Sequence, residues 1–498
     1  MRINSSVQVF ELMRILAFFW VVWGHEFAYR MPSSSNYIAP HFFDYTASSW
    51  GFTFIETGFY AVDIFLFIGG YVSILATSKY VNSFQKAKVS KWPAIYLFNI
   101  MKRYVRIMPA YAVMMLYYWK VNPALVSGPF SSETFLCNAS NFWQSWIIPL
   151  HSSITTPAIC AGWCWYLAVD FQLYMTIPLI CLLVKNNKKL GIMLTGSLAG
   201  ICTILTIIIV FVDKVRFLNF DNNSINVYYY AKFYLRGNVY YLGCLMSYLT
   251  MKGPPRKPKA AEGKDGLEEP LISDEEKMRK ELEEKESAER RKKKKIKAAK
   301  KMGMISIIVG SILMIFICCI LHYVFQFGRK ASTNVGLFWH MLFITFGKVV
   351  FVLSFMAIMM PLAAKYKAIG NFIAKNRLMQ LIGNVSFGGY LYHFTVIMLR
   401  LNSQSTMPYY KFYDLFGAWF MDICYTLVLA TASTLLIELP VQNMWRVGLE
   451  GKLMEKLKVY VNGSKKERKS GGKGERDSKA QNLPEKKTAT EQTAKEND

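Results

Sequence analysis

The chain has 498 residues, of which 53% are hydrophobic and 15% aromatic, and its formal net charge is +26. A soluble globular protein rarely combines these values, and the apolar residues lie in blocks of about twenty, the length that a helix needs to cross a bilayer. The lysines and arginines flank these blocks and fill the tails, so we interpret them as cytosolic flanks that face anionic lipid headgroups and exclude nucleic acid as a partner.

The apolar blocks predict an all-α membrane protein, a bundle of about ten transmembrane helices. The expected spans are 11–29, 57–78, 100–121, 163–184, 190–212, 228–250, 303–325, 337–363, 378–399 and 415–437. The linker after the second span is rich in lysine and arginine, whereas the linker after the third has neither. By the positive-inside rule, both termini are cytosolic in a multi-pass protein of the plasma membrane or an endomembrane.

Changes in composition divide the chain into four parts. Residues 1–250 hold the first six spans and an outward loop, 121–162. Residues 251–301 form a charged cytosolic insert, for which a plain linker is favoured over a regulatory element. Residues 302–460 hold the last four spans and a juxtamembrane segment, and 461–498 form a disordered cytosolic tail.

The outward loop carries residues suited to an oxidising compartment. Cys137 and Cys160 are expected to form a disulfide, with Cys164 as the alternative partner. Asn138 begins a glycosylation sequon on the side where modification occurs. Because no C-x-x-C pair supports a zinc site, we expect no metal.

The first span carries Arg14 and His25, eleven residues apart. This spacing puts both side chains on one helix face, about 16 Å apart along the axis. Asp63 in the second span lies at a depth close to that of His25, so we expect the two to hydrogen-bond and His25 to act as a general base. The alternative is a structural polar pair between helices. Gly69 and Gly70 are interpreted as sites of close helix packing.

Arg103 and Arg106 lie at the cytosolic end of the third span, three residues apart, so their guanidinium groups share one face. Guanidinium groups bind phosphate in a bidentate manner, and Arg14 lies at the same level. The pattern predicts that the three arginines bind a polyanion. The alternative, anchoring by the positive-inside rule, has about equal weight.

Further polar residues lie inside apolar spans, where ionisable groups are expensive and indicate a site. Asp170 and Gln172 lie in the fourth span and His393 in the ninth, and Arg236 and Lys348 are buried cations that could neutralise a carboxylate. We expect Asp170, Gln172, His393 and Arg236 to bind the acceptor or to support the catalytic residues.

Several segments resemble the acyltransferase 3 family and its eukaryotic branch, named nose resistant to fluoxetine. These segments, in family order, are "RILAFFWVVWGH", "GFYAVDIFLFIGGY", "RYVRIMPAY", "CWYLAVDFQLY", "YLRGNVYYLGCLMSYL", "GGYLYHFTVIM" and "IELPVQNMWR". The resemblance implies a membrane enzyme that uses acyl-CoA, commonly acetyl-CoA, to acylate hydroxyls of sugars or lipids. It implies that Arg14 and His25 are essential and that Arg103 and Arg106 bind the donor.

The resulting hypothesis is an O-acyltransferase in which Arg14, Arg103 and Arg106 hold the phosphates of acyl-CoA. His25, oriented by Asp63, removes the proton of a lipid or carbohydrate hydroxyl as it attacks the thioester. A covalent acyl-His25 intermediate is the variant of this scheme. The alternative function is a non-enzymatic transporter of lipids or small molecules, because buried histidines and aspartates also build transport sites.

Overall fold

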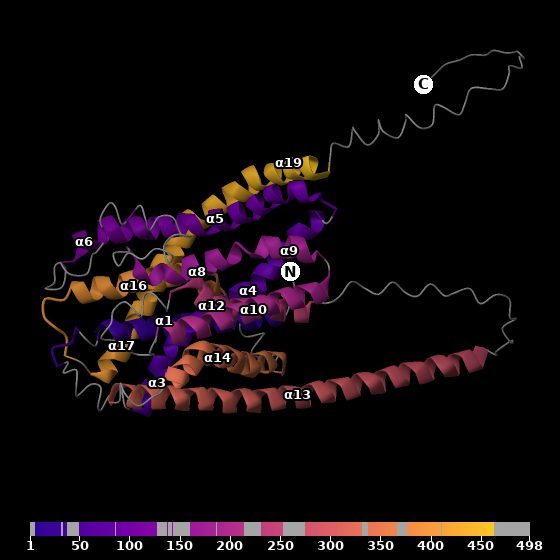
Figure 1. The fold of residues 1–498 in the computed structure, drawn as a ribbon, viewed down its shortest axis with the longest axis horizontal. Helices are drawn as coiled ribbons and strands as arrows, with labels where there is room; N and C mark the ends of the chain where they lie inside the picture. Colours follow the sequence, from indigo (N-terminus) through magenta and orange to yellow (C-terminus); the bar gives the residue numbers. More distant parts are fainter. Residues whose placement is uncertain are drawn as a thin grey trace, which may run out of the picture.

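The computed structural model describes residues 5–30, 33–36, 49–84, 86–126, 137, 142, 160–185, 187–213, 231–251, 274–330, 337–365, 376–409 and 411–462. Within these ranges the chain is helical and has no strand, which confirms the all-α class. The long helices run side by side along the long axis of the molecule (Figure 1).

The first half of the bundle consists of long helices and short connecting ones. The long helices are α1 (Ser5–Arg30), α4 (Ala61–Val81), α5 (Trp92–Leu116), α10 (Lys188–Val212) and α12 (Phe233–Thr250). The short ones are α3 (Trp50–Glu56), α6 (Asn122–Leu125), α8 (Trp165–Tyr174) and α9 (Ile177–Val184). The last two follow one another along the fourth expected span. Pro178 lies in the first turn of α9, where its missing N–H leaves no hydrogen bond unmade.

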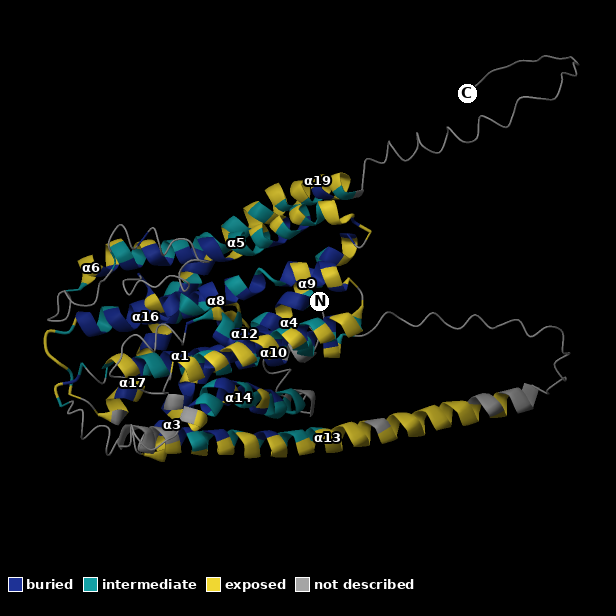
Figure 2. Cartoon of the chain, in the orientation of Figure 1, coloured by how far each residue is buried: buried dark blue, intermediate teal, exposed yellow. Residues whose placement is uncertain are grey.

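The second half begins with α13 (Asp274–Lys330), whose N-terminal part extends past the end of the other helices (Figure 1). This part belongs to the charged insert, and its described side chains are exposed (Figure 2). The helices that follow are α14 (Leu337–Lys365), α16 (Arg377–Asn402), α17 (Phe412–Ser433), α18 (Leu439–Met444) and α19 (Gly451–Asn462). The described part of the insert and the seventh expected span are therefore one continuous helix.

The segment from α17 to α19 is helical without a break because π-helical turns join its parts. These turns are Thr434–Glu438 and Trp445–Glu450. A π turn holds about one more residue than an α turn, is rare, and frequently occurs at functional sites. Each turn rotates the helix face that follows it.

Close packing of α4 against α12 depends on glycine. A Cβ added to Gly70 would lie 2.1 Å from the backbone oxygen of Tyr240, and one added to Gly243 would lie 2.1 Å from the backbone oxygen of Phe67. Small residues allow helix backbones to approach in this way in membrane proteins. Gly70 therefore has the packing role expected for it.

A buried aromatic cluster holds α1 against α5, α8 and α16. Phe18, Tyr111, Phe171 and Leu391 lie at its centre and are almost completely buried. Gly389 of α16 leaves room for the ring of Phe18, which would lie 2.8 Å from an added Cβ. This packing fixes α1 beside α16 and sets the height at which their polar side chains meet.

Helices lie at every expected span, and six helical segments of the described chain are long and apolar enough to cross a membrane. The six are Trp50–Phe84, Gly162–Val184, Lys188–Val212, Leu282–Tyr323, Phe338–Leu362 and Tyr413–Val461. The long helices outside this set are α1, α5, α12 and α16, which carry most of the ionisable residues considered above. A membrane protein is thus supported, whereas the count of ten spans and the cytosolic termini remain predictions.

Candidate active site

Two histidines meet where α1 packs against α16. Nε2 of His393 lies 3.2 Å from Nδ1 of His25, and the ring centroids are 5.0 Å apart. His393 is completely buried, whereas His25 is half-buried. The rings of Phe394 and Tyr29 complete the surroundings of His25, with centroids 5.8 and 6.3 Å from its own.

Backbone carbonyls determine the tautomers of this pair. Nδ1 of His393 lies 2.7 Å from the carbonyl oxygen of Tyr390, and a carbonyl can only accept, so this nitrogen donates. In the neutral ring Nε2 of His393 then accepts. Nδ1 of His25 donates both to this nitrogen and to the carbonyl oxygen of Val21, 3.1 Å away. We therefore assign the free lone pair to Nε2 of His25, which no described residue hydrogen-bonds.

The expected hydrogen bond between His25 and Asp63 is wrong. Oδ2 of Asp63 lies 2.6 Å from Nη1 of Arg236, and both residues are buried. Lys348, also buried, donates to the carbonyl oxygen of Leu235 and lies close enough to interact with Asp63. Asp63 faces α12 rather than α1 because α4 packs tightly against α12, so His393 takes the place beside His25 that was expected for Asp63.

Asp170 is neutralised by Arg103. The guanidinium group of Arg103 forms an ion pair with Oδ2 of Asp170, donates to the hydroxyl of Ser73 at 3.4 Å and lies over the ring of Tyr174. Arg103 therefore has a carboxylate partner already, which reduces the charge that it could offer to a ligand. Gln172, the other polar residue of this span, is half-buried and lines neither of the two cavities described next.

Arg14, Arg103 and Arg106 line one cavity of about 180 Å³, which we call the inner cavity. Its other lining residues include Asp170, Glu438, Tyr166 and Tyr390. No described residue forms a salt bridge with Arg14 or Arg106. The three arginines, which were expected at the same depth in the membrane, thus line the same cavity.

A second cavity of about 580 Å³, the outer cavity, shares Arg103 and Arg106 with the inner one. It also contains Lys102, Arg446 and Glu450, and Nζ of Lys102 lies 2.7 Å from Oε1 of Glu450. The two cavities together contain five cationic side chains and three carboxylates. This excess of positive charge suits an anionic ligand.

Tyr390 links the inner cavity to the histidines. Its ring lines the cavity and lies 5.2 Å from that of Tyr166, while its carbonyl oxygen accepts from His393. Its hydroxyl donates to the backbone oxygen of Trp163. Neither histidine lines the cavity, and Tyr390 is the lining residue that also contacts His393.

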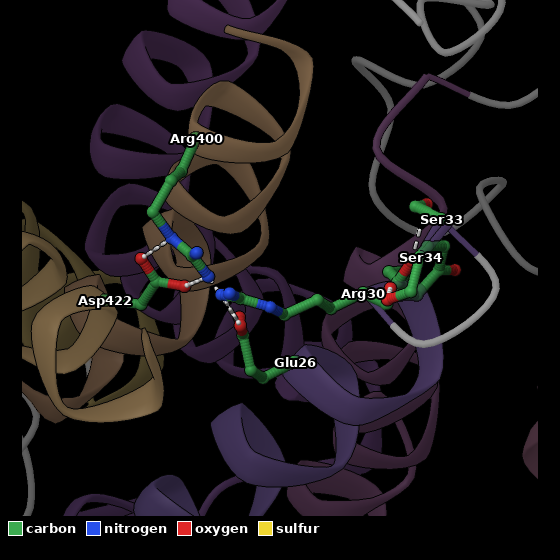
Figure 3. A network of polar contacts seen from close by, with 7 residues as sticks. Glu26, Arg30, Ser33, Ser34, Arg400 and Asp422 are labelled. Atoms are coloured by element: carbon green, nitrogen blue, oxygen red, sulfur yellow. Dashed lines mark hydrogen bonds and ion pairs between the residues drawn. The ribbon is translucent and has the colours of Figure 1, made fainter. Parts of the chain in front are cut away.

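A buried charge network, which the sequence analysis did not include, lies one residue beyond His25. Arg400 donates from Nη2 to Oδ2 of Asp422 at 2.7 Å and from Nε to Oδ1 at 2.8 Å, and it also bonds Glu26 (Figure 3). Nη1 of Arg30 lies 3.4 Å from Oε1 of Glu26, and both carboxylates are completely buried. The network joins α1, α16 and α17. Asp422, an ionisable residue inside an apolar span, was the signal that could have revealed it.

The disulfide that was expected in the outward loop is present. Cys137 and Cys160 form a disulfide, whereas Cys164 is a buried free thiol. Asn138 lies outside the described residues. Among the described residues, no group of three histidine, cysteine or acidic side chains could hold a metal ion.

Comparison with known proteins gives the family of the chain. A profile for the acyltransferase 3 family, described as an acyltransferase domain, matches residues 7–438. The chain belongs to the acyltransferase 3 family. Its membership supports a membrane acyltransferase with an acyl donor.

Two curated relatives from Caenorhabditis elegans match part of this acyltransferase 3 protein. It is 24% identical to "Nose resistant to fluoxetine protein 6" over 268 residues, which are 50% of this chain and 32% of that protein. It is 25% identical to "Regulator of hypoxia-inducible factor 1" over 221 residues, 40% of each chain. The matched regions thus cover two fifths or less of the relatives. No solved structure matches the chain.

Proposed function

We propose that this protein transfers an acyl group, most readily acetyl, from acyl-CoA to a hydroxyl of a lipid or carbohydrate. The observation that supports this best is the arrangement on α1. Arg14 lines a cavity with excess positive charge, and His25, three helical turns further on, has a free Nε2. The proposed binding site for a phosphorylated donor and the proposed base therefore lie along one helix.

The anionic end of the donor binds at the two cavities. Arg14 and Arg106 have no salt bridge to a described residue, so phosphate oxygens can complete their hydrogen bonds. Arg103 contributes less because Asp170 already neutralises it. Among the three arginines of the original hypothesis, we therefore assign the larger part of phosphate binding to Arg14 and Arg106.

The pantetheine arm carries the thioester from the inner cavity toward His25. Arg14 and His25 are about 16 Å apart along α1, which is comparable to the reach of this arm. Tyr166 and Tyr390 line the cavity and neither histidine does, so in this proposal the arm displaces at least one of these rings to reach His25.

His25 then acts as the general base. Its Nε2 removes the proton of the acceptor hydroxyl, whose oxygen attacks the thioester carbonyl carbon and forms the ester bond. The carbon–sulfur bond breaks, and the CoA thiolate receives the proton from His25. His393 orients the ring through the Nδ1 hydrogen bond. In the covalent variant, Nε2 of His25 carries the acyl group between donor and acceptor.

The alternative function is transport of a lipid or small molecule without covalent change. The neutralised pairs Asp63–Arg236 and Arg103–Asp170 do not favour it, because a proton relay needs groups that can change charge. Arg14 and Arg106, which form no salt bridge with a described residue, line the same cavity, and this favours one bound anionic donor over a transport path.

The test uses purified protein in nanodiscs with radiolabelled acetyl-CoA and total membrane lipids or glycans as acceptors. Wild-type protein should release CoA and label an acceptor, and His25→Ala should lower the rate about 10²- to 10⁴-fold. His322→Gln is the matched control, because His322 hydrogen-bonds Thr53 at 2.9 Å, away from the described cavities. Equal turnover by His25→Ala and wild type refutes the mechanism. Movement of unmodified lipid across the bilayer, without release of CoA, supports the transporter.

A further inference from the structure

The outer cavity has one wall outside the matched acyltransferase domain. This wall is the segment Leu439–Asn462, which we call the C-terminal extension and which follows residue 438, the last residue of the family match. The residues that it contributes to the cavity are Gln442, Trp445, Arg446, Glu450, Gly451 and Met454. The extension is therefore part of the cavity rather than a separate tail.

The extension is held in place by contacts with α4 and α5. Oε1 of Glu450 accepts from Nζ of Lys102 at 2.7 Å and from the hydroxyl of Tyr80 at 3.3 Å. Further along, Nζ of Lys91 lies 3.5 Å from the ring centroid of Tyr460. These contacts fix the position of Trp445 and Arg446, which begin the second π turn.

Trp445 is the aromatic residue of the outer cavity that remains available to a ligand. The rings of Tyr80 and Tyr174 also line the cavity, but Lys102 covers the first and Arg103 the second. No described residue stacks on Trp445 or places a cation over it, and its buried Nε1 has no hydrogen-bond acceptor among the described residues. A planar part of a ligand would stack on the ring face, and an acceptor atom elsewhere in the same ligand would accept from the indole N–H at the ring edge.

Arg446 supplies charge next to this ring. No described residue forms a salt bridge with Arg446, whereas Lys102 and Arg103 have carboxylate partners. A planar group beside a free guanidinium is the combination that a phosphorylated nucleoside requires.

The sizes of the cavities determine which end of the donor lies where. The outer cavity, about 580 Å³, lies within the range of pockets that hold drug-sized ligands, about 300–1,000 Å³. The inner cavity, about 180 Å³, is too small for a nucleotide but can accept a narrow chain. A donor with a nucleotide at one end must therefore leave that end in the outer cavity.

We propose that Trp445 and Arg446 of the C-terminal extension bind the nucleotide end of the acyl donor, with the base on Trp445 and a phosphate on Arg446. This inference rests on the proposed function and adds a specificity element outside the matched domain. The extension lets the protein distinguish CoA from donors that carry only the pantetheine arm. Arg106, shared by both cavities, contacts the phosphate nearer the arm.

The experiment measures equilibrium binding of two probes, CoA and 4′-phosphopantetheine, to the full chain in nanodiscs. The second probe lacks the nucleoside and its phosphates. Trp445→Ala and Arg446→Ala should each weaken binding of CoA about tenfold and leave 4′-phosphopantetheine unchanged. Arg106→Ala should weaken both. Val447→Ala, in the same π turn but 84% exposed, is the matched control and should change neither.

Each result that differs from the expected one overturns either this inference or the proposed function. If the Trp445 and Arg446 variants bind CoA as tightly as the wild type, or lose both probes equally, the extension has no specific role at the nucleotide. If the wild type binds CoA but does not distinguish it from 4′-phosphopantetheine, this inference fails while the proposed function stands. If the wild type binds neither probe, the proposed function itself fails.

Discussion

Replacing Asp63 by asparagine removes the countercharge of a buried arginine. Asp63 is completely buried, and its Oδ2 lies 2.6 Å from Nη1 of Arg236, which is 5% exposed. Removal of one partner from a buried ion pair costs about 3–5 kcal/mol, because the other charge stays buried and loses this countercharge. The ratio of folded to unfolded protein should therefore fall about 10²- to 10⁴-fold. Lys348, close to the same carboxylate, adds to the loss.

The free energy of unfolding can be measured in mixed micelles by SDS titration, followed through tryptophan fluorescence. In the double variant Asp63→Leu/Arg236→Met, two apolar side chains replace both charges, so most of the loss should be recovered. Tyr392→Phe is the control for an uncharged contact, since its hydroxyl donates to Ser433 at 3.2 Å. Hydrogen bonds between membrane helices contribute about 0.6 kcal/mol on average, so this change should be small.

Turnover of acyl-CoA by the double variant distinguishes a structural from a catalytic Asp63. Asp63 bonds Arg236, and His393 orients His25, so the folded double variant should keep turnover within a few-fold of the wild type. A double variant that folds as stably as the wild type but has lost turnover by 10²-fold or more would refute this reasoning.

Three further predictions follow from individual contacts. His393→Phe removes one of the two acceptors for Nδ1 of His25, leaving the carbonyl oxygen of Val21, and should lower kcat about fivefold with little change in KM for acyl-CoA, as steady-state kinetics would show. Gly70→Ala should lower the free energy of unfolding by about 1–3 kcal/mol, because its Cβ would meet the backbone of α12, whereas Gly196→Ala, with open space around it, should not destabilise the protein. Cys137→Ser opens a loop with a sequence separation of 23 and should cost about 3 kcal/mol under non-reducing conditions, whereas Cys164→Ser should preserve the disulfide.

The features that the sequence predicted well are those that depend on one helix. Helix geometry alone puts Arg14 and His25 on one face, and in the structure Arg14 lines a cavity with residues of α16 while His25 contacts His393 of the same helix. The spacing of Arg103 and Arg106 likewise places both at one cavity. No knowledge of helix neighbours was needed for these results.

The pairing of residues on different helices could not be predicted in the same way. The depth of a residue in the membrane follows from span boundaries, but its partner depends on which helices touch and how each is rotated. Asp63 and His25 have similar expected depths, yet α4 packs its glycines against α12 and so presents Asp63 to Arg236. Sequence order alone favours partners on consecutive spans, and for this reason His25 of the first span was wrongly paired with Asp63 of the second.

The ionisable residues of this acyltransferase 3 protein separate into two groups when their partners are compared. Asp63, Asp170 and Asp422 are each bound by an arginine, and a buried pair of this kind has little charge left to offer to a ligand. Arg14 and Arg106 are different, since no described residue forms a salt bridge with them although both face the inner cavity. A membrane protein keeps unpaired guanidinium groups in an enclosed space only where something else supplies the negative charge. The paired residues therefore hold the helices together, and we propose that the anionic donor binds at the two arginines without a salt bridge.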